Sequence, residues 1–288
     1  MGLLDSLSKM GVNQVSSEDM YKKEDTMPVP QQQQVAEKNE MVINEADYIL
    51  AKTYECPICD AKFKSLGIKA NKARQVAMDK DLRPIYEYHI EPIKYEPVTC
   101  PYCGYTVMGR YFIPLTSFQK KMVREGMGNG FVWNADPNAT TVSFEEALEK
   151  IKLALATAIV KKAKPSEKAY ICLKGCWLCR SYLEELERKD LDDEALKKEL
   201  SDNEREFEDN AYDGFVEAMA SETYPIAGMD EITLDYLIAV MALKRNRIDV
   251  SSKMVASILQ SSSASTRIKD KARDLKEEIV ARIKASKG

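Results

Sequence analysis

Hydrophobic residues recur every three to four positions in the second half of this sequence, which is the period of an amphipathic helix. From Ser143 the pattern runs through Leu148, Ile151, Leu155 and Ile159. Ser143 can cap this first helix, because its hydroxyl can accept a hydrogen bond from an amide of the first turn. Proline and glycine residues divide the remaining sequence, up to the C-terminus, into further helical segments. The pattern predicts six helices, at residues 143–159, 167–189, 193–220, 231–244, 250–260 and 266–284.

Residues 46–135 follow a different pattern, with short runs of β-branched and aromatic residues between Cys-Pro turns. Two of these runs, 61–68 and 93–99, have the composition of strands. A glycine-rich stretch at 126–130 marks the end of this region. Any helix between the two runs is broken by three prolines: Pro84, Pro92 and Pro97.

Residues 1–45 hold few side chains that a core could bury, so we predict a mostly disordered segment. Gly2 with Ser6 matches the N-myristoylation pattern, but an incidental match is favoured. The first ten residues predict a short amphipathic helix, because one helical face carries four apolar residues: Leu3, Leu4, Leu7 and Met10.

Together these patterns predict an α+β protein, in which a small β-rich module precedes an all-α domain. The predicted divisions are residues 1–45, 46–135 and 136–288. Helices joined by short turns favour antiparallel pairs, and such pairs stack into bundles or solenoids.

Composition places the chain among soluble globular proteins, with 44% hydrophobic and 31% charged residues. No stretch approaches the roughly 20 apolar residues that cross a bilayer, and the N-terminus lacks a secretory pattern. We therefore expect a cytoplasmic protein without a membrane span. In that reducing compartment, an odd total of seven cysteines indicates metal or thiol chemistry before disulfides.

The strongest chemical signal is a pair of Cys-Pro-x-Cys motifs with 40 residues between them: Cys56 and Cys59, then Cys100 and Cys103. Zinc prefers four soft ligands at tetrahedral corners, about 2.3 Å away for thiolate. Each Cys-x-x-Cys turn, called a knuckle here, presents two sulfurs. We predict that two knuckles, each at the start of a hairpin, bind one structural Zn²⁺ in a zinc-ribbon-like module with extra strands between them. Four thiolates leave no open position, so the site should do no chemistry.

Other interpretations of these residues stay open. The four cysteines could be reduced structural thiols, or one redox pair with two bystanders, although the proline shared by both knuckles disfavours this. His89, the single histidine, lies between the knuckles and could replace or support a thiolate. We favour a strand residue that faces solvent.

A second group, Cys172, Cys176 and Cys179, falls on one face of a predicted helix. The favoured interpretation is packing, because cysteine is small and readily buried and Trp177 flanks the stripe. A second metal site would need a fourth ligand from elsewhere. A redox pair at Cys176 and Cys179 would need a thiolate-stabilising cation, and Arg180 is the obvious candidate.

No phosphate-binding loop, serine-nucleophile elbow or metalloprotease motif is present. Asp79, Asp81 and Glu87 could pair as acid and base, but a solvated loop is favoured. We predict no enzymatic activity.

Charge bears on nucleic-acid binding. The chain has a net charge of −4, whereas residues 46–135 carry 13 basic and 9 acidic side chains. Bound Zn²⁺ with four thiolates would leave about +2 there, far from the strongly basic footprint of a dedicated nucleic-acid binder. Aromatic residues interleave with the basic ones: Lys62, Lys64, Lys69, Lys72, Arg74 and Lys80, with Phe63, Tyr86 and Tyr88. Acidic residues interrupt this set, which favours a solvated face: Asp79, Asp81, Glu87, Glu91 and Glu96.

Several stretches carry a family resemblance: Cys-Pro-Ile-Cys at 56–59 with Lys62-Phe63, Asp-Leu-Arg-Pro-Ile-Tyr at 81–86, Tyr95, Cys-Pro-Tyr-Cys-Gly-Tyr at 100–105, Tyr-Pro-Ile-Ala-Gly-Met-Asp-Glu at 224–231, Thr233-Leu234 and Tyr236-Leu237-Ile238. The chain resembles, over most of residues 50–285, the bacterial domain-of-unknown-function family numbered 2225. The resemblance implies a zinc-ribbon-like module joined to tetratricopeptide-like helices, and no assigned activity. Three positions depart from the pattern: Asp60 where the first knuckle usually has glycine, and Asn246 and Ser251 at the glycine and small positions of a tetratricopeptide turn.

We therefore expect a zinc-binding interaction protein, an adaptor or scaffold that binds another protein through its helical domain. The alternatives are a nucleic-acid-associated regulator that uses the basic face and, less favoured, a thiol redox protein that uses Cys176 and Cys179.

Overall fold

The computed structural model describes residues 43–127, 131, 136 and 138–285. Contacts divide the chain into residues 1–42 and 43–288, and the fold described here belongs to the second unit. The predicted N-terminal helix, the myristoylation pattern and part of the glycine-rich stretch lie outside the described residues.

The described strands pair as three separate antiparallel hairpins. Their bounds are β1 Ile49–Glu55 with β2 Lys62–Ile68, β3 Gln75–Met78 with β4 Pro84–Tyr86, and β5 Pro97–Thr99 with β6 Thr106–Met108. The predicted strand at 61–68 is confirmed as β2. The β3–β4 hairpin supplies the extra strands predicted between the two knuckles.

The predicted strand at 93–99 is wrong over its first half, because Pro92–Tyr95 form a 3-10 turn, η5. Pro92 occupies the first turn, where its fixed φ suits a helical start. The Glu91 carboxylate caps this turn by accepting a hydrogen bond from the Ile93 amide at 3.1 Å. The Glu91 cap and Pro92 therefore favour a 3-10 turn here more strongly than the β-branched composition favours a strand. The other described 3-10 turns are η3 Glu45–Tyr48, η4 Glu87–His89 and η6 Gly109–Tyr111.

Helix α1, Ser117–Gly126, was not predicted, although the sequence carries its start signal. The Thr116 hydroxyl accepts a hydrogen bond from the Gln119 amide at 3.2 Å, and the Gln119 side-chain oxygen accepts one from the Thr116 amide at 3.1 Å. This reciprocal pair is a capping box, which a Thr-x-x-Gln pattern announces.

The six predicted helices are confirmed, and each end lies within two residues of its prediction. The Ser143 hydroxyl caps its helix by accepting a hydrogen bond from the Glu146 amide at 3.1 Å. The helices are α2 Phe144–Val160, α3 Pro165–Arg188, α4 Glu194–Ser221, α5 Glu231–Lys244, α6 Ile248–Gln260 and α7 Thr266–Ala285.

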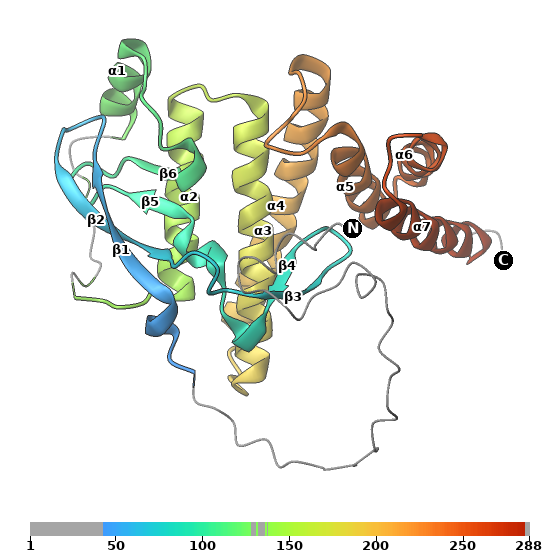
Figure 1. Cartoon of the computed structure of the whole chain (residues 1–288), viewed down its shortest axis with the longest axis horizontal. Helices are drawn as coiled ribbons and strands as arrows, with labels where there is room; N and C mark the ends of the chain where they lie inside the picture. The colour runs from blue at the N-terminus through green and yellow to red at the C-terminus, as the bar shows by residue number, and fades with distance from the viewer. Residues whose placement is uncertain (1–42, 128–130, 132–135, 137, 286–288) are drawn as a thin grey trace, which may run out of the picture. The chain divides into compact units, whose positions relative to one another are not determined.

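Helices α2, α3 and α4 lie side by side, and α5, α6 and α7 form a second packed group (Figure 1). The largest core is shared between hairpins and helices, since Ile49 and Met108 belong to the same cluster as Ile151, Leu178 and Phe215. A smaller core joins α5 to α6 and α7. Residues on both sides of the predicted division at 135/136 therefore contribute to one core.

Candidate metal centre

Both cysteine knuckles are the turns of β-hairpins. Cys56 and Cys59 lie between β1 and β2, and Cys100 and Cys103 lie between β5 and β6. The prediction that each knuckle begins a hairpin is wrong, because the strand before Cys56, β1, was missed. Strands hold both ends of each turn, which fixes the directions in which the sulfurs point.

The two turns have the same backbone hydrogen bonds. The Asp60 amide donates to the Cys56 carbonyl at 2.9 Å, and the Gly104 amide donates to the Cys100 carbonyl at 3.0 Å. Asp60 has a φ of 59° and Gly104 one of 74°. This left-handed conformation suits glycine, and aspartate tolerates it better than most residues. The departure at Asp60 therefore keeps the geometry of the knuckle.

The four sulfurs converge. The Cys56 and Cys103 sulfurs lie 3.5 Å apart, the Cys59 and Cys100 sulfurs lie 3.6 Å apart, and all four lie within 4.8 Å of one another. A disulfide would need about 2.05 Å. A metal with four thiolates at about 2.3 Å would place the sulfurs about 3.8 Å apart. The cluster has the dimensions of a tetrahedral site and could hold a metal ion.

The surroundings of the sulfurs favour negative charge. The amides of Ile58 and Cys59 donate to the Cys56 sulfur, the first at 3.4 Å. The neighbouring Cys103 thiol lowers the pKa of Cys100, whereas the Cys100 sulfur raises the pKa of Cys56 and of Cys103. Sulfurs this close cannot all ionise without a cation among them. A bound divalent metal would remove that repulsion.

The site is enclosed on one side. Cys56 and Cys100 are fully buried, whereas Cys59 is exposed and Cys103 is half-buried. Arg124 of α1 ties down the first knuckle, because its guanidinium donates to the Ile58 carbonyl at 2.7 and 3.1 Å. Four sulfurs would fill a tetrahedral coordination shell and leave no position for a substrate. Such a centre can hold two hairpins together.

His89 lies outside this cluster. It is exposed and belongs to η4, so the prediction of a solvent-facing residue is confirmed, while its placement in a strand is wrong. The metal-ligand group contains the four cysteines without it.

The second cysteine group forms a packing face, as predicted. Cys172, Cys176 and Cys179 are each at most 1% exposed on α3 and belong to the shared core. Burial raises the pKa of Cys172 and of Cys179 to about 12 and also raises that of Cys176. Arg180 lies 3.7 Å from the Cys176 sulfur but does not offset burial. A redox role needs a depressed thiol pKa, which these residues lack.

The prediction of a solvated loop at Asp79 and Asp81 is wrong. Asp81 is 2% exposed and lies 2.8 Å from the Arg180 guanidinium and 3.6 Å from the Lys244 ammonium. Burial opposes its ionisation, yet the two cations hold the pKa of Asp81 below its ordinary value. Arg180 also pairs with Asp79 at 3.2 Å. The buried Asp81 carboxylate therefore pins the loop between β3 and β4 to α3 and α5, through a long-range pairing that the sequence does not reveal.

Asp81, Cys176 and Glu208 also lie within 4.8 Å of one another and offer metal-ligand atoms. The Arg180 and Lys244 cations already face this group: Lys244 pairs with Glu208 at 2.6 Å. Because these cations neutralise the carboxylates, the group serves as a charge clamp between loop and helices.

Of the six basic residues that interleave with aromatic ones, three face partners within the chain. Lys80 pairs with Glu278 of α7 at 2.8 Å, and the Lys69 ammonium donates to the Asp47 carbonyl at 2.9 Å. Lys62 stands opposite Glu55 in the β1–β2 register. A nucleic-acid surface here stays an untested prediction.

A family model described as "Uncharacterized protein conserved in bacteria (DUF2225)" matches residues 49–279. The chain belongs to this family. The match includes both knuckles, the three hairpins and nearly all of the helices, so the predicted family membership is confirmed. No curated protein and no solved structure matches the chain. Among the described residues, no helix is long and apolar enough to cross a membrane.

Proposed function

We propose that this protein is a zinc-stabilised, non-enzymatic adaptor of the cytoplasm. One Zn²⁺, held by Cys56, Cys59, Cys100 and Cys103, joins two hairpins, and the helical part binds a segment of another protein. The observation that carries the metal half is the convergence of four sulfurs from two distant knuckles. An all-thiolate tetrahedral donor set selects zinc or iron over magnesium and calcium.

Metal analysis of the purified protein tests this half. We expect one zinc per chain and no visible absorption, and the Cys100→Ser variant should lose the metal. Cys176→Ser is the matched control, since it removes a thiol outside the cluster and should keep full zinc content. Stoichiometric iron, or zinc retained by Cys100→Ser, would refute the assignment.

The adaptor half is supported by a groove between α2 and α4 with a volume of about 310 Å³. Leu155 and Ile159 of α2 and Phe207 of α4 form its apolar lining, and Ile159 is 59% exposed. The Asn203 side-chain nitrogen, in the same groove, is buried and has no hydrogen-bond partner in the described structure. The groove also carries the charged side chains of Lys152 and Glu206. A groove between two helices with an apolar floor and a polar border suits an amphipathic helix of a partner.

The α5–α6 turn supports the tetratricopeptide-like interpretation of the helices. Asn246, at the expected glycine position, has a φ of 57°, which asparagine tolerates. Ser251, at the expected small position, is fully buried, and its hydroxyl donates to the Ala239 carbonyl at 2.8 Å. Both departures therefore preserve a tight helix pair.

Capture of the tagged protein from a lysate of its host, with and without nuclease, tests the adaptor half. We expect a partner that survives nuclease and is lost from Ile159→Glu, which places a charge in the groove. Val216→Glu is the matched control, because Val216 is 43% exposed on α4 and does not line the groove. Equal capture by both variants would mean that the partner binds outside the groove. Capture that nuclease abolishes would favour the nucleic-acid alternative.

A further inference from the structure

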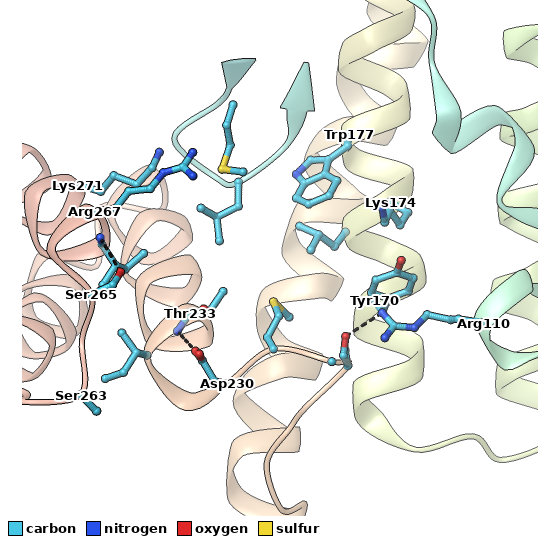
Figure 2. A pocket seen from close by; sticks show the side chains of 18 residues that line it. Arg110, Tyr170, Lys174, Trp177, Asp230, Thr233, Ser263, Ser265, Arg267 and Lys271 are labelled. Atoms are coloured by element: carbon cyan, nitrogen blue, oxygen red, sulfur yellow. Dashed lines mark hydrogen bonds between the residues drawn. The ribbon is translucent and has the colours of Figure 1, made fainter. Parts of the chain in front are cut away.

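A cavity of about 510 Å³ lies between α3 and the α5–α7 group, far along the chain from the knuckles. Pockets for small organic ligands typically measure about 300–1,000 Å³. Its walls come from α3, from the turn at 227–230 before α5, and from the start of α7, with residues of the β3–β4 loop (Figure 2). None of the roles assigned above uses this space.

One wall is apolar and aromatic. Trp177, Leu173 and Tyr170 of α3 line the cavity together with Met229. The Trp177 indole offers a flat surface on which a ring or aliphatic body of a ligand can pack. This wall is suited to a ligand with a sizeable apolar part.

The other wall carries uncommitted positive charge. Arg267 and Lys271 lie one turn apart on α7, and both line the cavity (Figure 2). Neither forms an ion pair among the described residues, and Lys271 only stacks at 6.0 Å over the Tyr236 ring. Arg267 lies in the first turn of α7 and Lys271 in the second, near the positive end of the helix dipole, which also favours an anion. The chain as a whole carries −4, so this local positive charge runs against its average.

The remaining charged groups of the lining already have partners and hold the walls in place. Lys174 pairs with Glu96 at 2.7 Å, and the Arg110 guanidinium donates to the Ala227 carbonyl at 2.8 Å. Asp230, the one carboxylate of the lining, caps α5 by accepting from the Thr233 amide at 2.7 Å. Arg267 and Lys271 are thus the charges left for a ligand.

A second, independent feature points to a ligand. Trp177 is 6% exposed, and its indole N–H is buried without a hydrogen-bond partner in the described structure. A buried donor without an acceptor lowers the stability of the folded state. Figure 2 shows the Trp177 ring over the cavity, on the wall opposite Arg267 and Lys271. An acceptor atom of a bound molecule would satisfy this group after a small shift of the wall.

We propose that this cavity binds a small amphipathic anion, an aromatic or aliphatic body that bears one carboxylate or phosphate group. The apolar body packs on Trp177 and Leu173. The anionic group pairs with Arg267 and Lys271 at the start of α7. This site shares no residue with the zinc centre or with the α2–α4 groove, so its test is independent of both.

The test uses the full-length protein with Trp133→Phe, which leaves Trp177 as the single tryptophan. The probe is 8-anilinonaphthalene-1-sulfonate, an aromatic anion, and its uncharged analogue N-phenyl-1-naphthylamine serves as comparison. We expect saturable quenching of Trp177 by the anionic probe with one site, and binding of the neutral probe weaker by about tenfold or more, which is the effect of about 1.4 kcal/mol.

The variant R267A/K271A should weaken binding of the anionic probe by about tenfold or more, because it removes both charge-assisted contacts to the anionic group. The matched control is R273A/K276A, which removes the same charge from exposed positions of α7 outside the cavity. The affinity of this control variant for the anionic probe should stay within about twofold of the unsubstituted protein's, because solvent and salt screen charges that lie outside the cavity. Circular dichroism and thermal melting confirm that both variants fold.

Phenyl phosphate and benzoate as competitors then identify the anionic group. Displacement of the probe by either supports the proposal and names the phosphate or the carboxylate. Equal losses in both double variants, equal affinity for the two dyes, or displacement by neither competitor would overturn it. A Trp177 response to an acidic peptide but to no small anion would also overturn it and make the cavity a peptide site.

Discussion

The knuckle cysteines lie in the turns of two hairpins, whereas Cys172, Cys176 and Cys179 lie along one face of a helix. In the knuckles, four sulfurs approach to 3.5–3.6 Å in pairs and receive backbone amides. On α3, the thiols are buried among apolar side chains, and burial raises their pKa. The helix uses its own amides for internal hydrogen bonds, so none is free to stabilise a thiolate.

This difference teaches that spacing alone does not make a ligand set. Cys176 and Cys179 have the same Cys-x-x-Cys spacing as the knuckles. A turn leaves backbone amides free to donate to sulfur, whereas a helix interior does not. The carboxylates beside Cys176 face Arg180 and Lys244 in place of a metal.

The largest expected effect comes from breaking the knuckles. Cys100→Ser should abolish zinc binding and unfold the β1–β2 and β5–β6 hairpins, because structural zinc contributes folding free energy on the order of 10 kcal/mol in zinc-finger peptides. Amide hydrogen exchange should show lost protection in both hairpins. A chelator should reproduce the effect in the unmodified protein. Cys100→Ser with normal protection would show that the sulfurs do not hold the hairpins.

The charge clamp beside Cys176 should come next. Asp81→Asn removes the buried carboxylate that faces Arg180 and Lys244 and should lower the free energy of unfolding by roughly 2 kcal/mol, while zinc content stays unchanged. Urea denaturation measures the loss. Glu278→Gln is the control: its pairs with Lys80 and Arg282 are partly exposed, so the change should stay within about 1 kcal/mol. Equal losses of stability in the two variants would mean that the buried Asp81 pair stabilises the fold no more than the surface pair does.

The two knuckles can be compared at Asp60 and Gly104, the residues whose backbone has a positive φ. Gly104→Ala should cost about 2 kcal/mol, because alanine disfavours a φ of 74°. Its Cβ would also lie 2.7 Å from the Phe131 ring. Asp60→Gly should be neutral or stabilise by up to about 1 kcal/mol, since glycine adopts this conformation without penalty. The melting temperatures of the zinc-loaded variants measure these changes. A lower melting temperature for Asp60→Gly would show that the Asp60 side chain stabilises the knuckle.

The smallest effect concerns the thiols of α3. The pKa of Cys179 is about 12 in the folded protein, against 9.0 as its ordinary value. The unfolded chain therefore releases the proton first as pH rises, so stability is fully present below pH 9 and falls between about 9 and 12. Cys179→Ala should reduce this decline by on the order of 1 kcal/mol between pH 8 and 10.

Iodoacetamide labelling checks the same property directly. At pH 8 the α3 cysteines of the folded protein should stay unmodified, while chelated protein should label rapidly at the knuckles. Fast labelling of Cys176 or Cys179 in the folded, zinc-loaded state would restore the thiol redox alternative.

Much of the fold followed from sequence patterns that act locally. Helical periodicity and the Ser143 cap predicted α2 to α7 to within two residues, because these elements depend on neighbours three or four positions away. The four knuckle cysteines were predicted for a similar reason, since each pair is set by one tight turn. Helix α1 was missed although the Thr116–Gln119 capping box that starts it is a local signal.

Other features were decided only by the tertiary structure. Asp81 reads as a loop residue in the sequence, and it is buried only because Arg180 and Lys244, about 100 and 160 positions away, meet it. The cavity beside Trp177 likewise joins segments that lie far apart in the sequence, from the β3–β4 loop to α7. The sequence alone determined the elements and the donor set, because local bonds and side-chain chemistry specify them. Which charges become buried and which surfaces enclose a space depend on contacts between distant segments, and only the folded chain supplies those.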